Sequence, residues 1–302
     1  IITTDPRLRW FNFLIQVGGQ VDLISKRTGI TVFAPSDTAF KTFDYLNVLA
    51  TPGYELHARD FVRFHVSPFY LQKVSLVPQT LDMLLLDGQI TLTNAGDETV
   101  RLESFALEPA SVEEFDVVAA NGVLHILDNP LLPKFATLTA MDFLDESVNS
   151  DRLESQNIQH SKFLNLVMAA GLQEQMRGLV DTTFFFPDDD FISDEMFAYL
   201  TKGGNEDILV QMIQYHILPE LINYETLLFL TPNEFVTEQG EMVTIDRRQA
   251  LIVDGFVTAS VSLFSRGLIY HLNGLLMPES LKDTISGEVV EPSEEEKEKP
   301  KI

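Results

Sequence analysis

The sequence has no cysteine, which excludes disulfide bonds, thiolate metal sites and thiol catalysis. No apolar run approaches the roughly 18 residues that a membrane-spanning helix needs. Asn-x-Ser/Thr sequons are absent, so no N-linked glycan is expected. A phosphate loop, a dinucleotide glycine fingerprint and a Gly-x-Ser-x-Gly motif are absent too. The chain starts at Ile1 without a basic and apolar leader, so we expect a processed product.

Positive charge is scarce. There are 21 Lys and Arg against 45 Asp and Glu, a formal net charge of −24. The imbalance is largest over residues 158–281, which hold 17 acidic and 6 basic side chains. Such a surface repels phosphate backbones and anionic lipid, so nucleic acid is not an expected partner. An apolar fraction of 45% indicates a globular chain, and 302 residues are enough for two domains.

The stretch Thr31–Phe40 carries the clearest local pattern in the chain. Its first four residues are β-prone, and Pro35 then ends the strand because it has no N–H for a central ladder. Ser36 and Asp37 supply oxygens suited to cap a helix that would follow directly. The same pattern recurs at Thr183–Ile192, where Phe185, Pro187 and Asp189 match Phe33, Pro35 and Asp37.

Three further blocks repeat in the same order. The matching pairs are Phe11–Gly19 with Phe163–Gly171, Arg63–Val66 with Gln214–Ile217, and Asn121–Asp128 with Arg266–Asn273. The first pair predicts short amphipathic helices ended by glycine. Four blocks at almost constant spacing predict two copies of one domain.

Each copy changes from helical to strand patterns in its second half. Gln89–Thr93 and Thr99–Glu103 alternate with period two around an Asn/Gly-containing loop, which predicts a hairpin. Met242–Asp246 and Gln249–Val253 predict the same in the second copy. Helices followed by strands are typical of α+β domains. We predict domains at residues 6–133 and 158–281, an acidic linker at 134–157 whose stretch Leu138–Leu144 could pack on either domain, and a disordered tail at 282–302.

These blocks resemble the fasciclin domain family. Its signature boxes are Thr-Val-Phe-Ala-Pro-(Ser/Thr/Asn)-x-x-Ala-Phe and Asn-Gly-Val-(Ile/Val)-His-(Val/Ile)-(Ile/Val)-Asp, with a Tyr-His pair between them. The first copy carries all three, with Phe64-His65 at the pair, and the second copy carries the first box and Tyr215-His216. The closing box of the second copy departs from the pattern at Arg266, Tyr270 and Asn273.

The resemblance spans nearly all of residues 6–281 and implies two tandem wedges of short β-strands backed by α-helices. It also implies a non-enzymatic secreted or cell-surface protein, periplasmic if bacterial, that contacts protein or glycan partners in adhesion or in the matrix, without a cofactor. The alternative is a secreted or periplasmic binding protein for a glycan or small apolar ligand, which a deep apolar pocket between helices and wedge would favour. The matching positions are expected to be structural: Phe33, Pro35, Asp37, His65, Gly122, His125, Phe185, Pro187, Asp189, Tyr215, His216 and Gly267.

His65 and His216 each end an apolar helical stripe. An imidazole there could act as a general base or a ligand, or it could be a core histidine that bonds the last helical carbonyls. The core role is favoured because no cysteine, second histidine or serine elbow accompanies either residue. We therefore expect both side chains to be buried.

The acidic run Asp188–Asp190 raises the question of calcium. An EF-type loop that started at Asp188 would need Gly and Glu where the chain has Ser193 and Tyr199. Carboxylates also interact favourably with the first turn of a helix. A solvated helix cap is therefore favoured over a weak divalent-cation site, and no metal site is expected.

The candidate partner-binding residues are Asp116 and Val117. Fasciclin-domain proteins that engage integrins use an Asp followed by an aliphatic residue shortly before the closing box, and these two residues occupy that place. The matching place in the second copy, Val261-Ser262, has no carboxylate. An exposed pair could offer a charge and an apolar knob to a partner, whereas the alternative is that Asp116 caps a strand end and Val117 belongs to the core. We expect the first copy to be adhesive and the second to act as scaffold.

Overall fold

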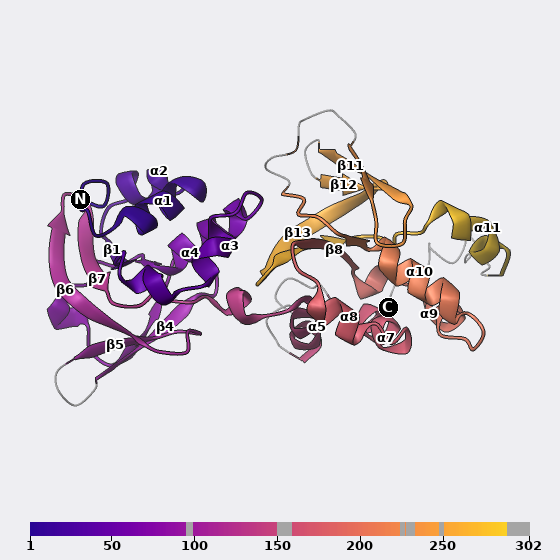
Figure 1. Cartoon of the computed structure of the whole chain (residues 1–302). Helices are drawn as coiled ribbons and strands as arrows, with labels where there is room; N and C mark the ends of the chain where they lie inside the picture. Colours follow the sequence, from indigo (N-terminus) through magenta and orange to yellow (C-terminus); the bar gives the residue numbers. More distant parts are fainter. Residues whose placement is uncertain (95–98, 150–158, 224–226, 228–232, 248–250, 289–302) are drawn as a thin grey trace, which may run out of the picture. The chain divides into compact units, whose positions relative to one another are not determined.

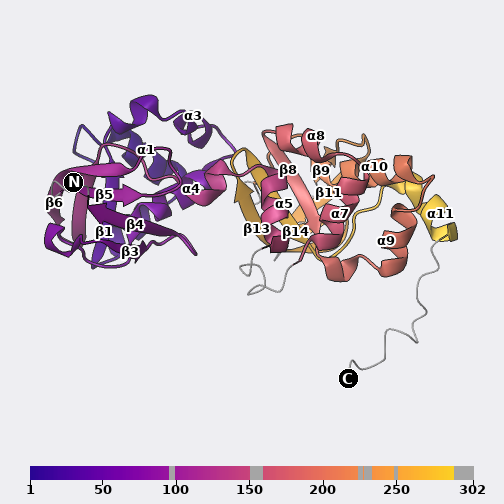
Figure 2. The ribbon, with the colours of Figure 1, turned by 90° about the horizontal axis from the view of Figure 1, so that it is seen from below.

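The computed structural model describes residues 1–94, 99–149, 159–223, 227, 233–247 and 251–288. The chain divides into two compact units, Ile1–Thr137 and Leu138–Ile302. Each unit runs from helices into strands, as the repeat predicts (Figures 1 and 2). Among the described residues, no helix is both long and apolar enough to cross a membrane.

In the first unit, helices precede most of the strands. The helical segments are α1 (Arg9–Val17), α2 (Val21–Lys26), η1 (Ala39–Thr42), α3 (Tyr45–Leu49), α4 (Glu55–Phe64), η2 (Lys73–Ser75) and η3 (Lys134–Thr137). The strands are β1 (Ile30–Pro35), β2 (Val66–Ser67), β3 (Gln79–Asp82), β4 (Gln89–Asn94), β5 (Val100–Glu103), β6 (Ala110–Ala119) and β7 (Gly122–Leu127). They form one sheet in the order β2-β1-β7-β6-β5-β4-β3, and only β1 and β7 pair in parallel.

Strand β1 is buried on both faces, so its apolar residues divide between two cores. Val32 and Ala34 pack with helices α1 and α4 in one cluster, whereas Phe33 points into a second cluster formed by the wedge strands. β4 shows the predicted alternation of buried and exposed residues and pairs with β5, as the hairpin requires. A parallel strand covered on both faces reads as a continuous apolar run, which is why the first box is so distinctive.

Gly122 starts β7 because the two parallel strands approach closely there. A Cβ at this position would lie 2.3 Å from the carbonyl oxygen of Ile30. Gly267 is held in the same way in the second unit, where a Cβ would lie 2.2 Å from the carbonyl oxygen of Thr182. Both motif glycines are therefore required by backbone packing.

The second unit repeats this architecture. Its helical segments are α5 (Ala140–Asn149), α7 (Ser161–Ala169), α8 (Gln173–Gly178), η4 (Asp189–Phe191), α9 (Asp194–Leu200), α10 (Glu206–Tyr215) and α11 (Glu279–Glu288). Its strands are β8 (Thr182–Pro187), β9 (Ile217–Leu218), β10 (Asn233–Val236), β11 (Met242–Arg247), β12 (Leu251–Val253), β13 (Phe256–Phe264) and β14 (Gly267–Leu272). The sheet order is β10-β11-β12-β13-β14-β8-β9, with β14 parallel to β8.

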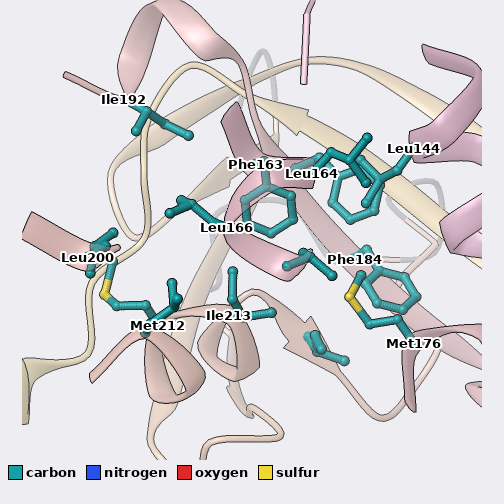
Figure 3. Packing of buried hydrophobic residues seen from close by; sticks show 14 of the residues in the cluster. Leu144, Phe163, Leu164, Leu166, Met176, Phe184, Ile192, Leu200, Met212 and Ile213 are labelled. Carbon is teal, nitrogen blue, oxygen red and sulfur yellow. The ribbon is translucent and has the colours of Figure 1, made fainter. Parts of the chain in front are cut away.

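The helical core of the second unit centres on aromatic rings from α7 and β8. Phe163 and Phe184 lie among Met176, Met212 and Ile213 (Figure 3). The rings of Phe163 and Phe186 have centroids 5.3 Å apart. The two short helices that carry the glycine stops end as predicted, with Gly19 and Gly171 at φ 64° and 68°.

The segment expected to be a linker contains a helix that belongs to the second unit. Met141 and Leu144 of α5 are fully buried in its core. Thr139 and Asp142 form a reciprocal cap at the start of α5, with each backbone N–H donating to the other side chain. The remainder of the expected linker, residues 150–157, lies outside the described residues.

The expected tail is likewise helical at its start, which corrects the prediction that it is disordered from residue 282. Leu281 and Ile285 of α11 are four residues apart, share one face and are buried in the second core. Glu241 accepts hydrogen bonds from the backbone N–H groups of Glu279 and Ser280, so it caps this helix. Residues 289–302 lie outside the described residues.

Asp37 and Asp189 do cap helices, but not the helices predicted. The segment after Asp37 is the short 3-10 turn η1, and Ser36 Oγ accepts from Ala39 N–H there. Asp37 instead accepts from the backbone N–H of Trp10, in the first turn of α1. Asp189 accepts from the N–H groups of Ser161 and Lys162 at the start of α7. Each carboxylate thus joins the end of the central strand to the first helix of its repeat.

Candidate functional site

The segment between β2 and β3 of the first unit is fixed by side chains of three strands of the sheet. On β1, Thr31 Oγ1 donates to the carbonyl oxygen of Phe69 at 2.7 Å and accepts from the N–H of Leu71 at 2.8 Å. On β7, His125 Nε2 donates to the carbonyl oxygen of Leu71 at 2.8 Å. On β6, Asp116 Oδ1 accepts from the N–H of Lys73 at 2.8 Å.

These anchors bind backbone groups of the segment, and several of its side chains are exposed, whereas Leu76 is buried in the wedge core. Four large apolar side chains are exposed, and we call them the loop surface: Phe69, Tyr70, Val74 and Val77. Phe69 is 53% exposed and Val74 is 82% exposed. Lys73 Nζ lies 4.7 Å from the ring centroid of Phe115, which adds a cation–π contact beside the surface. Apolar groups gathered on an ordered segment are typical of an interaction site.

The predicted pair Asp116-Val117 lies at the edge of this segment. Asp116 has a left-handed backbone, φ 58°, at an irregularity where β6 shifts register between Glu114 and Val117. Its N–H donates to His125 Nδ1, while its carboxylate anchors Lys73. Val117 is half-buried and packs against the helical core, whereas Val118 is 61% exposed. The exposed aliphatic neighbour of Asp116 is thus one residue later than the sequence indicated.

The second unit keeps two of the three anchors. Thr183 Oγ1 donates to Glu220 O and accepts from Ile222 N–H. Tyr270, which occupies the place of His125, donates to Ile222 O at 2.6 Å. At the place of Asp116 the second unit has Val261, which carries no carboxylate to form the third anchor. This asymmetry follows directly from the altered closing box.

The motif aromatics lie beneath these anchors. Phe33 and Phe185 are fully buried, and each stacks on the ring of the anchoring residue, with centroids 5.5 Å from His125 and 6.1 Å from Tyr270. Tyr215 differs from its counterpart Phe64 by a hydroxyl group. That hydroxyl lies 2.7 Å from Asp254 Oδ2, and burial together with the carboxylate raises the pKa of Tyr215.

His65 and His216 are buried, as predicted, and make the same hydrogen bonds in both units. His65 Nδ1 donates to Phe61 O and Nε2 accepts from Leu131 N–H. His216 Nδ1 donates to Met212 O and Nε2 accepts from Leu276 N–H. Both rings are therefore neutral, and burial lowers the pKa of each to about 4. Each ring joins the end of a helix to the segment after the closing box.

A buried polar chain in the second unit was not predicted. Ser262 Oγ donates to His271 Nε2 at 2.8 Å, His271 Nδ1 donates to His160 Nε2 at 2.8 Å, and His160 Nδ1 donates to Pro187 O at 2.9 Å. Burial lowers the pKa of His271 to about 3, so it is a poor general base at neutral pH. The internal repeat contained a clue to this chain of hydrogen bonds. The positions in the first copy that match Ser262, His271 and His160 hold the apolar residues Val117, Ile126 and Leu8.

The acidic run is used for capping. Asp188 Oδ1 accepts from the N–H of Asp190, and Asp189 caps α7 as described above. Across the described residues, no group of three or more His, Asp or Glu side chains is arranged to hold a metal ion.

A cleft of about 1080 Å³ opens in the second unit between its helices and the wedge strands. Six apolar side chains line it, those of Phe191, Met196, Met242, Phe256, Leu275 and Met277. Four carboxylates and one ammonium group line it as well, those of Asp190, Glu241, Asp254, Glu279 and Lys282. No sequence pattern predicts this cleft, because its walls come from segments far apart along the chain.

The two helix-backed wedges, each built around a parallel strand pair with a glycine at the close approach, define the class of fold. The fasciclin domain model matches residues 6–133 and 158–278, and the chain belongs to the fasciclin domain family. Fasciclin domains are an adhesion-type family. The tandem arrangement predicted from the internal repeat is confirmed.

Relatives of the chain come from animals and fungi. It is 24% identical to Stabilin-2 of Rattus norvegicus over 62% of this chain and 13% of that protein. It is 25% identical to the fasciclin-like arabinogalactan protein elcF of Phaeosphaeria nodorum, over 74% of this chain and 69% of that protein. It also resembles the FAS1 domain pair of the insect cell adhesion molecule Fasciclin I, with a TM-score of 0.39, 16% identity and coverage of 94% and 99% of the two chains. The chain thus spans only a small part of Stabilin-2.

Proposed function

We propose that the protein is a non-enzymatic extracellular or cell-surface adhesion protein that contacts matrix or cell-surface partners through its first unit. Membership of an adhesion-type family supports this function. The observation that carries it is the loop surface, because four large apolar side chains are exposed on a segment anchored to three strands. An ordered apolar surface loses little conformational entropy when a partner covers it.

In this proposal Asp116 contributes by anchoring the segment. Its carboxylate holds Lys73 N–H, so the charge is partly satisfied within the protein. Val118, rather than the half-buried Val117, is the exposed aliphatic side chain next to it. The second unit has no carboxylate at the matching place and is proposed to act as scaffold.

The test is cell adhesion to surfaces coated with the full chain, using Asp116→Ala and Asp116→Asn. Asparagine keeps an acceptor oxygen, whereas alanine removes it. We expect Asp116→Ala to weaken adhesion by several-fold and Asp116→Asn to retain most of it, with the melting temperature as a control for folding. If both variants lose adhesion equally at unchanged melting, the negative charge itself contacts the partner. Full adhesion by Asp116→Ala would contradict this assignment of the surface.

A further inference from the structure

The cleft of the second unit, lined by Phe191, Met196, Met242 and the side chains around them, combines apolar and acidic side chains. Three of the chain's eight methionines line it, at positions 196, 242 and 277. Methionine side chains are unbranched and polarisable, and they adapt to apolar ligands of varied shape. Met242 is 57% exposed, and Phe191 is also exposed, so part of the apolar lining is open to solvent.

The walls of the cleft are held by hydrogen bonds. Asp254 has a left-handed backbone, φ 46°, and its carboxylate accepts from Thr244 N–H and from the Tyr215 hydroxyl, so the turn after β12 is fixed against β11. Glu241 fixes the start of α11, and hydrogen bonds from Ser280 lower the pKa of this carboxyl. The Asp190 carboxylate, by contrast, makes no hydrogen bond with any described side chain or backbone group. The walls of the cleft are therefore ordered before a ligand binds, and the negative charge of Asp190 is available to a partner.

We propose that this cleft binds a basic amphipathic segment of a partner protein, with apolar side chains against the methionines and Lys or Arg side chains beside the carboxylates. Charge complementarity selects this occupant. Four carboxylates against one lysine repel acidic peptides, and a second copy of this chain would bring a net charge of −24. An apolar groove that receives one face of a helix is a recurring mode of peptide recognition. The inference goes beyond the proposed function and is independent of the loop surface.

The first unit provides the contrast. Its counterpart of Tyr215 is Phe64, which has no hydroxyl to hold a turn. A Cβ at Gly88 would lie 3.0 Å from the Phe64 ring, so the backbone just before β4 packs directly against that ring. The second copy places Glu241 before β11, where the first copy has Gly88 before β4. Two side chains that line the cleft, Tyr215 and Glu241, are thus specific to the second copy.

Binding is measured by fluorescence anisotropy of a labelled synthetic Leu/Lys peptide whose leucines share one helical face, titrated with the full chain. The paired variants are Met242→Ser in the cleft and Met168→Ser outside it, at a side chain of similar exposure, 53%. Asp190→Asn is paired with Asp207→Asn, which is exposed and outside the cleft. All four positions are on the surface, so folding is retained and is checked by melting.

We expect Met242→Ser to weaken peptide binding by about tenfold and Asp190→Asn by roughly threefold, with a smaller salt dependence for the latter. Met168→Ser and Asp207→Asn should bind as the unchanged chain does. Three results would overturn the proposal: no binding of the peptide, equal binding of a scrambled peptide of the same composition, or equal weakening by cleft and control variants.

Discussion

Phe33 is fully buried at the point where β1, β7 and the wedge meet, and its ring stacks on His125. Removing the ring leaves a cavity that a central strand cannot close. Phe33→Ala should therefore lower the free energy of unfolding of the first unit by about 3–5 kcal/mol, measured by urea denaturation. Phe105→Ala, at an exposed ring of the same unit, should change it by less than about 0.5 kcal/mol. A Phe33→Ala protein with unchanged unfolding would refute the structural role of the first box.

The neutral histidines at the two helix ends predict a pH dependence of stability. Burial lowers the pKa of His65 and of His216 to about 4, below the ordinary value of 6.5. Between these values the unfolded chain binds more protons, so stability is fully present above pH 6.5 and falls as the pH drops toward 4. The slope is about 1.4 kcal/mol per pH unit for each histidine. Urea denaturation between pH 7 and 4.5 should show this loss of stability. His216→Gln should reduce the slope for the second unit by the contribution of one histidine, about 1.4 kcal/mol per pH unit. An unchanged slope in that variant would show that His216 is not the titrating group.

At the scale of elements, the polar chain from β13 to α7 can be compared with its apolar counterpart in the first unit. His271→Ile alone leaves the Ser262 hydroxyl and His160 Nε2 without partners, and should cost roughly 1–3 kcal/mol. The triple variant His160→Leu, Ser262→Val and His271→Ile installs the side chains of the first copy, so it should be no less stable than the parent. Urea denaturation of the second unit compares the three proteins. A triple variant less stable than the single one would contradict this equivalence.

Helix α5 should behave as part of the second unit. Leu144 is fully buried there, so Leu144→Ala should destabilise that unit by about 2–5 kcal/mol and leave the unfolding of the first unit unchanged. Two transitions in calorimetry, or tryptophan fluorescence from Trp10 in the first unit, separate the two effects. Destabilisation of the first unit instead would place α5 there.

The helices and strands of both units could be predicted well from the sequence. The reason is that each signature box has a local residue pattern that recurs in the second copy. The sequence predicted the hairpin of β4 and β5, the glycine stops and the buried histidines, which depend on residues close together along the chain. It could not place Asp37 on α1, because that contact joins residues 27 apart through the folded core. Nor could it predict which of Val117 and Val118 is exposed, since the left-handed Asp116 interrupts the alternation of β6. The cleft was missed for the same reason, as only folding brings α9, β11 and α11 together.

At the scale of the molecule, the two copies share the same arrangement of helices and strands but differ in the surfaces that they offer to a partner. The first copy anchors an exposed apolar segment with three side chains, whereas the second lacks the carboxylate anchor and opens an acidic cleft. The division predicted from sequence, with the first copy as the adhesive one, remains a proposal. The cleft is proposed to add a second contact, one that combines apolar and acidic side chains.

The most direct measurement is cell adhesion to surfaces coated with the full chain, comparing Phe69→Ser/Tyr70→Ser with Trp10→Ser. All three side chains are exposed and belong to the first unit, but only the first two lie on the loop surface. Aromatic anchors at the centre of an interface contribute more than 1 kcal/mol each, so the double variant should reduce adhesion by about tenfold or more, while Trp10→Ser retains it. Equal adhesion by the double variant and the unchanged chain would contradict the account.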